Sequence, residues 1–131
     1  MKLVNVLKMK ILICDDDTMT LRALKFQFQK EGFEIFQANN GREAQTILTE
    51  NDISVLITDI YMPMINGLEL ITYVRKNLRR DMPIVIVSRV NVEDTIAFAK
   101  ELGANDYHTK PINLENVLKS VKQLMKIDGE N

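Results

Sequence analysis

Short runs of consecutive apolar residues alternate along the chain with segments in which apolar residues recur every three or four positions. Continuous runs are typical of strands buried on both faces of a sheet, and the spaced pattern is typical of helices packed along one side. The expected strands are residues 10–14, 34–38, 54–58, 83–87 and 105–108. The expected helices are residues 18–31, 42–50, 68–77 and 92–102, followed by a last amphipathic helix after Pro111.

The order of these elements predicts the fold class. Leu21, Leu24 and Phe28 would face the core from the first helix, and Gly32 and Gly103 mark helix ends. Because strands alternate with helices, we expect right-handed crossovers and a parallel sheet that is covered by helices on both faces. The sequence therefore predicts one α/β domain, without a linker or an internal repeat.

Polar residues that can carry chemistry stand where the predicted strands end. Asp15 and Asp16 end the first strand, Asp59 the third and Ser88 the fourth, and Lys110 follows the fifth. Open parallel sheets bind their ligands outside the carboxyl ends of the strands. These side chains are therefore expected to converge on one edge of the sheet.

Three of these residues are carboxylates, which points to a metal ion. Close carboxylates repel each other, and one of them would hold a proton unless a cation offset the charge. Oxygen ligands with no His or Cys beside them favour Mg²⁺ or Mn²⁺ over Zn²⁺. Asp17 and Thr18 are interpreted instead as capping residues of the first helix.

The site residues belong to a longer series of motifs. In order, the chain carries Asp15-Asp16, Asp59 with Met62-Pro63 and Gly67, Ser88, and Tyr107 with Lys110-Pro111. With this order and spacing, the chain resembles the response-regulator receiver domain of two-component signalling, in its stand-alone, chemotaxis-regulator-like form. The resemblance covers residues 9–125, and the agreement of five separated motifs makes it specific.

The resemblance implies a flavodoxin-like (βα)5 fold with strand order 2-1-3-4-5 and helices on both faces. It implies a receiver domain at residues 9–126, an N-terminal extension at residues 1–8 and a short tail at residues 127–131, without an output domain. In the family the bond equivalent to Lys110–Pro111 is cis, so a cis peptide is expected here.

The resemblance also implies a function. Asp59 would accept a phosphoryl group from the phosphohistidine of a sensor histidine kinase or a histidine phosphotransfer protein, and would lose it slowly by self-catalysed hydrolysis. The chain would thus be a phosphoacceptor and not an enzyme. Mg²⁺, or Mn²⁺ in its place, would be held by Asp16, Asp59 and the backbone carbonyl of Tyr61, with Asp15 acting through coordinated water.

Lys110 would supply a positive charge to the acylphosphate, and Ser88 would offer its hydroxyl to a phosphoryl oxygen. In the family this hydroxyl moves toward the phosphoryl group and an aromatic residue on the fifth strand, here Tyr107, turns inward. The surface made by the fourth helix, fifth strand and fifth helix would then report the change to a downstream protein target. A phosphorylation-dependent homodimer is among the assemblies that the resemblance allows.

Two positions depart from the common family pattern. Arg89 stands after Ser88, where a small residue is usual, and it could narrow access, add a guanidinium to the phosphate pocket or pair with an acid of a partner. Tyr61 is bulkier than the usual residue two positions after the phosphoacceptor. We expect Tyr61 to shield the acylphosphate from water and to slow its hydrolysis.

Amino-acid composition limits the classes of partner that the chain is expected to bind. Seventeen Lys and Arg against eighteen Asp and Glu leave a formal charge of -1, so there is no basic field for direct nucleic-acid binding. No apolar run approaches the roughly 20 residues that span a bilayer, so no membrane insertion is expected. A single cysteine, Cys14, is interpreted as a buried apolar residue in a cytoplasmic protein.

Two other functions compete with the phosphoacceptor. A receiver-like adaptor would dock its partner without phosphorylation, which the complete set of acidic residues, Ser88 and Lys110 disfavours. A Mg²⁺-dependent phosphohydrolase would commonly carry a second Asp two residues after the nucleophile, where this chain has Tyr61. The basic run at residues 75–80 is interpreted as complementing the carboxyl end of the third helix, and His108 as structural.

Overall fold

The computed structural model describes residues 9–127, so the expected extension at residues 1–8 and most of the expected tail, residues 128–131, lie outside the described residues. The strands are β1 Lys10–Cys14, β2 Glu34–Ala38, β3 Val55–Thr58, β4 Ile84–Ser88 and β5 Asp106–Thr109. The helices are α1 Thr18–Lys30, α2 Gly41–Glu50, α3 Gly67–Thr72, α4 Glu93–Leu102 and α5 Leu114–Leu124, and a π-helical segment, Tyr73–Asn77, extends α3.

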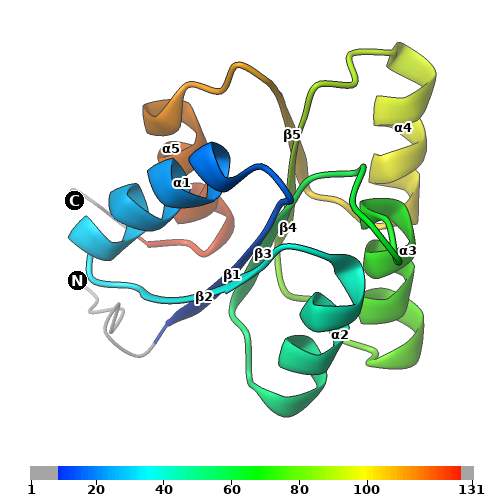
Figure 1. Ribbon diagram of the computed structural model, residues 1–131, viewed down its shortest axis with the longest axis horizontal. Coiled ribbons are helices and arrows are strands. Elements are labelled where there is room, and N and C mark those ends of the chain that lie inside the picture. Colours follow the sequence, from blue (N-terminus) through cyan, green and yellow to red (C-terminus); the bar gives the residue numbers. More distant parts are fainter. Residues whose placement is uncertain (1–8, 128–131) are drawn as a thin grey trace.

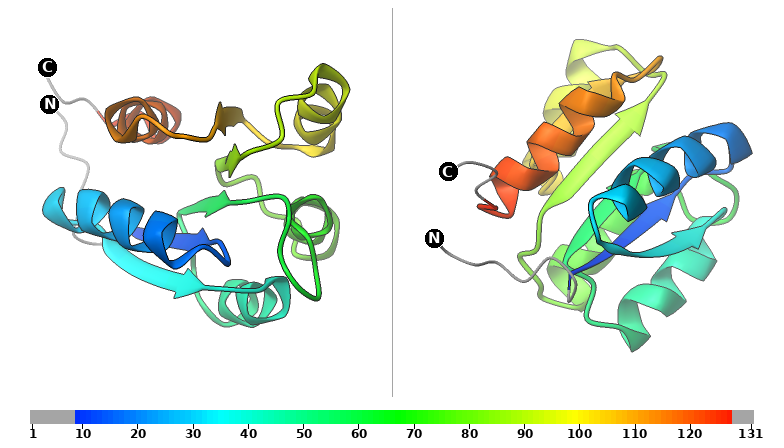
Figure 2. Two further views of the ribbon diagram at one scale, coloured as in Figure 1. Left: turned by 45° about the horizontal axis from the view of Figure 1, so that its top comes forward. Right: turned by 90° about the vertical axis from the view of Figure 1, so that its left-hand side faces the viewer.

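The five strands form one parallel sheet in the order β2-β1-β3-β4-β5 (Figure 1). Helices α1 and α5 cover one face, and α2, α3 and α4 cover the other (Figure 2). The predicted fold class and strand order are confirmed. No helix within residues 9–127 is long and apolar enough to cross a membrane.

Side chains along the central strands point alternately to the two faces of the sheet and divide the core into two clusters. In β1, Ile11 and Ile13 pack with the helices α1 and α5, whereas Leu12 and Cys14 pack on the opposite face with α2 and α3. Successive side chains of a strand point to opposite faces, which explains why β1, β3 and β4 read as continuous apolar runs. The predicted inward residues of α1, among them Phe28, are buried.

The end of the third helix differs from the prediction. The sequence pattern predicted one α-helix over residues 68–77, but the α-helical part ends at Thr72 and π-helical hydrogen bonding follows. The N–H of Leu78 donates to the carbonyl of Tyr73, five residues earlier, at 2.9 Å. Apolar spacing does not encode which carbonyl a backbone N–H reaches, so the pattern cannot show this change.

Two arginines of the basic run make contacts that were not predicted from sequence. The Arg75 guanidinium donates to the carbonyls of Arg80, Met82 and Gly103 at 2.7 to 2.9 Å. Arg80 donates to the carbonyls of Leu48 and Asn51. The two arginines thus bind the carboxyl ends of α4 and α2, while Arg75 and Lys76 also lie in the last turn of the segment Tyr73–Asn77 that ends the third helix.

Candidate functional site

Strand pairing brings the predicted site residues to one edge of the sheet. Cys14 of β1 pairs with Thr58 of β3, so the residues that follow them, Asp15 and Asp59, lie next to each other. The N–H of Asp59 donates to the carbonyl of Cys14 at 2.9 Å, which fixes this register beyond the last pair of the ladder. Backbone hydrogen bonding thereby positions two of the predicted carboxylates.

The three predicted aspartates form a compact acidic cluster. Carboxylate oxygens of Asp15, Asp16 and Asp59 lie within 4.8 Å of one another. Asp15 and Asp59 are buried and Asp16 is exposed. Burial raises the pKa of Asp15 above its ordinary value, although hydrogen bonds from Lys110 and from the N–H of Asp17 oppose the rise. These hydrogen bonds therefore offset only part of the cost of burying the charged form of Asp15.

Lys110 lies between two of these carboxylates. Its Nζ is 2.8 Å from Oδ2 of Asp15 and 3.1 Å from Oδ2 of Asp59, and its side chain is 9% exposed. Burial lowers the pKa of this ammonium, but the hydrogen bonds to Asp15 and Asp59 outweigh it and the net pKa is raised. The expected cis bond between Lys110 and Pro111 is present. The contact with Asp15 was not predicted, because strand-end position alone does not pair individual atoms.

The loop after β3 is folded tightly against Asp59. Oδ1 of Asp59 accepts a hydrogen bond from the N–H of Ile60 at 2.6 Å, and the N–H of Gly67 donates to the carbonyl of Ile60. A Cβ on Gly67 would lie 2.1 Å from the carbonyl oxygen of Asp59. The glycine is thus required for the close approach that lets α3 begin beside the phosphoacceptor candidate.

The two predicted switch residues meet at the loop after β4. Ser88 is buried, and its Oγ accepts from the N–H of Val90 at 3.2 Å. The hydroxyl of Tyr107 donates to the carbonyl of the same Val90 at 2.6 Å. Burial raises the pKa of Tyr107. Both side chains therefore form a hydrogen bond with the same residue of the β4–α4 loop, and a movement of this loop would change both hydrogen bonds.

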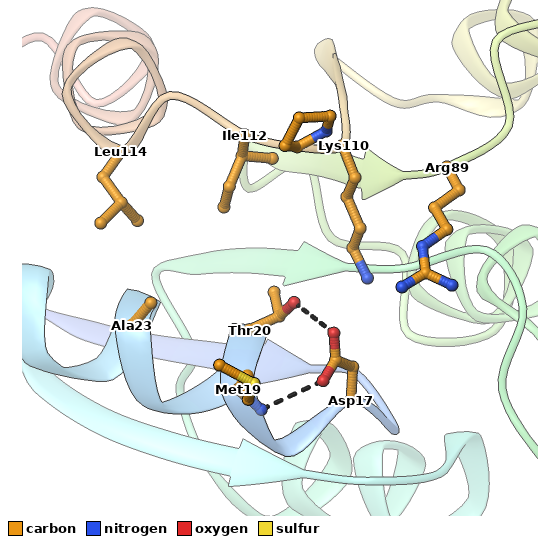
Figure 3. Close-up of a pocket in the computed structure, with 9 residues that line it drawn as sticks. Asp17, Met19, Thr20, Ala23, Arg89, Lys110, Ile112 and Leu114 are labelled. Carbon is orange, nitrogen blue, oxygen red and sulfur yellow. Dashed lines mark hydrogen bonds between the residues drawn. The ribbon is translucent and has the colours of Figure 1, made fainter.

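Two cavities open at this edge of the sheet. The smaller, of about 220 Å³, is lined by Asp59, Ser88 and Lys110 together with Asp16, Asp17, Tyr61 and Arg89. The larger, of about 550 Å³, lies between the start of α1 and the segment after β5 (Figure 3). The cavities share three lining residues, Asp17, Arg89 and Lys110.

The remaining polar candidates take structural roles. The carboxylate of Asp17 accepts from the N–H of Met19 and from the Thr20 hydroxyl, so the capping role predicted for it is confirmed. His108 lies 3.1 Å from Asp106, which also accepts from the Ser120 hydroxyl. These hydrogen bonds join β5 to α5 and do not include the acidic cluster.

An α/β domain with this strand order, three clustered aspartates and a lysine at the carboxyl edge of its sheet has the features of a receiver domain. Residues 11–122 match the response regulator receiver domain family, and the chain belongs to this family. It is 32% identical over 117 residues to the transcriptional regulatory protein SrrA of Staphylococcus aureus, an alignment that covers 89% of this chain and 48% of that protein. The chain thus spans about half the length of this relative.

Solved structures agree with this assignment. A two-component response regulator from Clostridium difficile has a TM-score of 0.86 and 29% identity, with coverage of 94% of this chain and 100% of that one. The chemotaxis response regulator CheY4 of Vibrio cholerae has a TM-score of 0.82 and 27% identity, with coverage of 88% and 98%. The predicted resemblance to chemotaxis-type receiver domains is confirmed.

Proposed function

We propose that the chain acts as the phosphoacceptor of a His-to-Asp phosphorelay, with Asp59 as the phosphorylated residue. The observation that carries the proposal is the environment of Asp59: a buried carboxylate, 3.1 Å from a lysine ammonium, within a cluster of acidic oxygens. Phosphoryl transfer needs fixed positive charge around the reacting oxygens and little other chemistry from the protein. The lysine supplies one such charge.

The donor set fits a hard divalent cation. Three carboxylates lie close together, and Lys110 offsets only part of their charge. Asp16, Asp59 and the backbone carbonyl of Tyr61 would hold Mg²⁺ or Mn²⁺, with Asp15 acting through coordinated water. When bound, the ion would neutralise charge on the phosphoryl oxygens.

The side chains of the chain have distinct roles in the proposed transfer. A carboxylate oxygen of Asp59 forms a bond to phosphorus as the bond between phosphorus and the donor histidine breaks, and the imidazole leaves. Lys110 contacts the carboxylate that reacts and is poised to stabilise the product. The Ser88 hydroxyl, which accepts from Val90, would turn to donate to a phosphoryl oxygen.

This rearrangement would reach the surface through Val90. Loss of the contact between Ser88 and the N–H of Val90 would free the β4–α4 loop, to which the Tyr107 hydroxyl is bonded. The surface of α4, β5 and α5 would then change its affinity for a downstream protein or for a second copy of the chain. Upstream, a sensor histidine kinase or histidine phosphotransfer protein would supply the phosphoryl group to this chain in the cytoplasm.

The proposal is tested by phosphorylation of the purified chain. Incubation with phosphoramidate and Mg²⁺ should add about 80 Da in intact mass spectrometry, the mass of one phosphoryl group. Asp59→Asn should abolish the adduct, and Asp52→Asn, which changes an exposed aspartate outside the cluster, should retain it. A folded wild-type chain that forms no adduct with an active donor would favour the adaptor that works without phosphorylation.

A further inference from the structure

Arg89 is a positively charged residue at the site, and it has no role in the phosphoryl transfer proposed above. It follows the buried Ser88, is itself exposed, and borders both cavities. No ion pair or side-chain hydrogen bond within the described part of the chain includes its guanidinium. Asp17, the acidic residue that lines both cavities, already accepts hydrogen bonds from Met19 and Thr20.

Arg89 belongs, with Asp17 and Lys110, to the part of the lining that the two cavities share. Figure 3 shows it pointing, like the Lys110 ammonium, into the gap above Asp17. The smaller cavity contains the reactive edge of Asp59, whereas the larger has apolar lining from Ala23, Ile112 and Leu114 among others. A donor could therefore place its phosphoryl group in the smaller cavity and the rest of the molecule in the larger.

In-line attack by Asp59 directs the leaving group away from that carboxylate, and Arg89 is a cation that lines the same cavity. The charge that develops there depends on the donor. An acyl phosphate releases a carboxylate, whereas phosphoramidate releases ammonia and phosphohistidine releases imidazole, both neutral. A guanidinium binds a carboxylate through two parallel hydrogen bonds and offers no such match to ammonia.

We propose that Arg89 determines donor specificity by binding the carboxylate that leaves from an acyl phosphate. The bond from an Asp59 oxygen to phosphorus forms, the bond from phosphorus to the acyl oxygen breaks, and the electron pair stays on the departing carboxylate, so no proton transfer is needed. The apolar wall of the larger cavity receives the acyl carbons. This inference rests on the proposed phosphoacceptor function and adds to it a residue that distinguishes one class of donor from another.

The experiment compares acetyl phosphate with phosphoramidate. The second-order rate constants of Asp59 phosphorylation are measured with Mg²⁺ for wild type, Arg89→Ala, Arg89→Lys and Arg42→Ala. Arg42 is an exposed arginine at the start of α2 that lines neither cavity, so its variant controls for the loss of surface charge.

In Arg89→Ala, we expect the ratio of the acetyl phosphate rate to the phosphoramidate rate to fall about tenfold. This is a smaller fall than the loss of a fully buried oxyanion donor would cause, because Arg89 is exposed. Arg89→Lys should restore part of the ratio, since it keeps the charge without the planar fork. Arg42→Ala should retain the wild-type ratio.

Other outcomes overturn the inference. An equal fall with both donors would assign Arg89 to the phosphoryl group, and a rise with acetyl phosphate would show that the side chain narrows access. If Arg42→Ala lowered the ratio of the two rates as much as Arg89→Ala does, the effect would be a general attraction of anions by surface charge and not a property of Arg89. Absence of an adduct from both donors in the wild type would instead contradict the phosphoacceptor function itself.

Discussion

At the scale of single residues, Cys14 shows how the core controls reactivity. Its side chain is fully buried, and Sγ lies 3.1 Å from Sδ of Met62. Burial raises the pKa of the thiol to about 12, and the nearby carboxylates of Asp15, Glu43 and Asp59 add to the rise, against a hydrogen bond with Thr58. The thiolate is the reactive form, so the native thiol should be inert near neutral pH.

We therefore expect Cys14 to react with an aromatic disulfide reagent at pH 8 far more slowly in the native chain than in urea. The absorbance of the released thiol measures both rates. Free glutathione under the same two conditions controls for the effect of urea on the reagent. Rapid, stoichiometric reaction of the native chain would show that the β1 end of the core opens readily.

Tyr61 is the residue for which shielding of the acylphosphate is predicted. Its side chain is 67% exposed but lines the smaller cavity beside Asp59. Tyr61→Asn should shorten the lifetime of the phosphorylated chain, because water would reach the phosphoryl group more freely. Intact mass spectrometry follows the loss of the phosphoryl adduct of about 80 Da, and the rate of this loss gives the lifetime.

Met64→Ala is the matched control for this substitution. Met64 belongs to the same loop and is 70% exposed, but it does not line the smaller cavity. Its replacement should leave the decay rate unchanged. An unchanged lifetime in Tyr61→Asn would mean that the tyrosine ring does not control access of water.

Sequence reasoning located the site residues more readily than it described their contacts. The positions of Asp15 and Asp59 follow from strand ends in a parallel sheet, which hydrophobic patterning alone predicts. The ion pair of Lys110 with Asp15 and the shared bonding of Ser88 and Tyr107 to Val90 depend on side-chain conformation and loop path. Neither is encoded in residue spacing.

At the scale of elements, strands and most helices could be predicted because their apolar periods are distinct. The exception is the segment after Thr72, where helical hydrogen bonding shifts register without a change in which residues are apolar. Val74 remains fully buried within this segment. Packing is thus preserved while the backbone hydrogen bonding changes.

Arg75 should contribute to stability through these contacts. Arg75→Ala removes donors from the carbonyls of Arg80, Met82 and Gly103, and we expect the free energy of unfolding to fall by about 2 kcal/mol, the range for hydrogen bonds to charged groups. Urea denaturation measures the change. Lys76→Ala, which alters the exposed neighbour on the same turn, should cost much less; equal losses would contradict the role of the guanidinium.

At the scale of the whole molecule, the acidic cluster lowers the stability of the fold because it keeps a buried carboxylate charged. Burial raises the folded-state pKa of Asp15, so its ionisation opposes folding. For a carboxyl group with a raised pKa, stability falls as pH rises from the unfolded pKa through the folded one, and the deficit persists at neutral pH. Functional sites commonly carry such a cost.

Asp15→Asn should therefore raise the urea midpoint at pH 7 in the absence of divalent cations, and this gain should shrink as the pH falls below the unfolded pKa of the carboxyl. Mg²⁺ should stabilise the wild type more than the variant, because a ligand of the folded state adds stability according to its affinity. Asp52→Asn provides the control for an exposed aspartate. A lower midpoint in Asp15→Asn would show that its ion pair with Lys110 outweighs the desolvation of the carboxylate.

The sheet ends on β2 at one side and on β5 at the other, and both outer strands are short, at 5 and 4 residues. Each carries a carboxylate, Glu34 on β2 and Asp106 on β5. Short edge strands that carry a charge pair poorly with the sheet edge of a second molecule, which discourages edge-to-edge aggregation. We therefore expect a second copy of the chain to bind through the helical surfaces and not through the edges of the sheet.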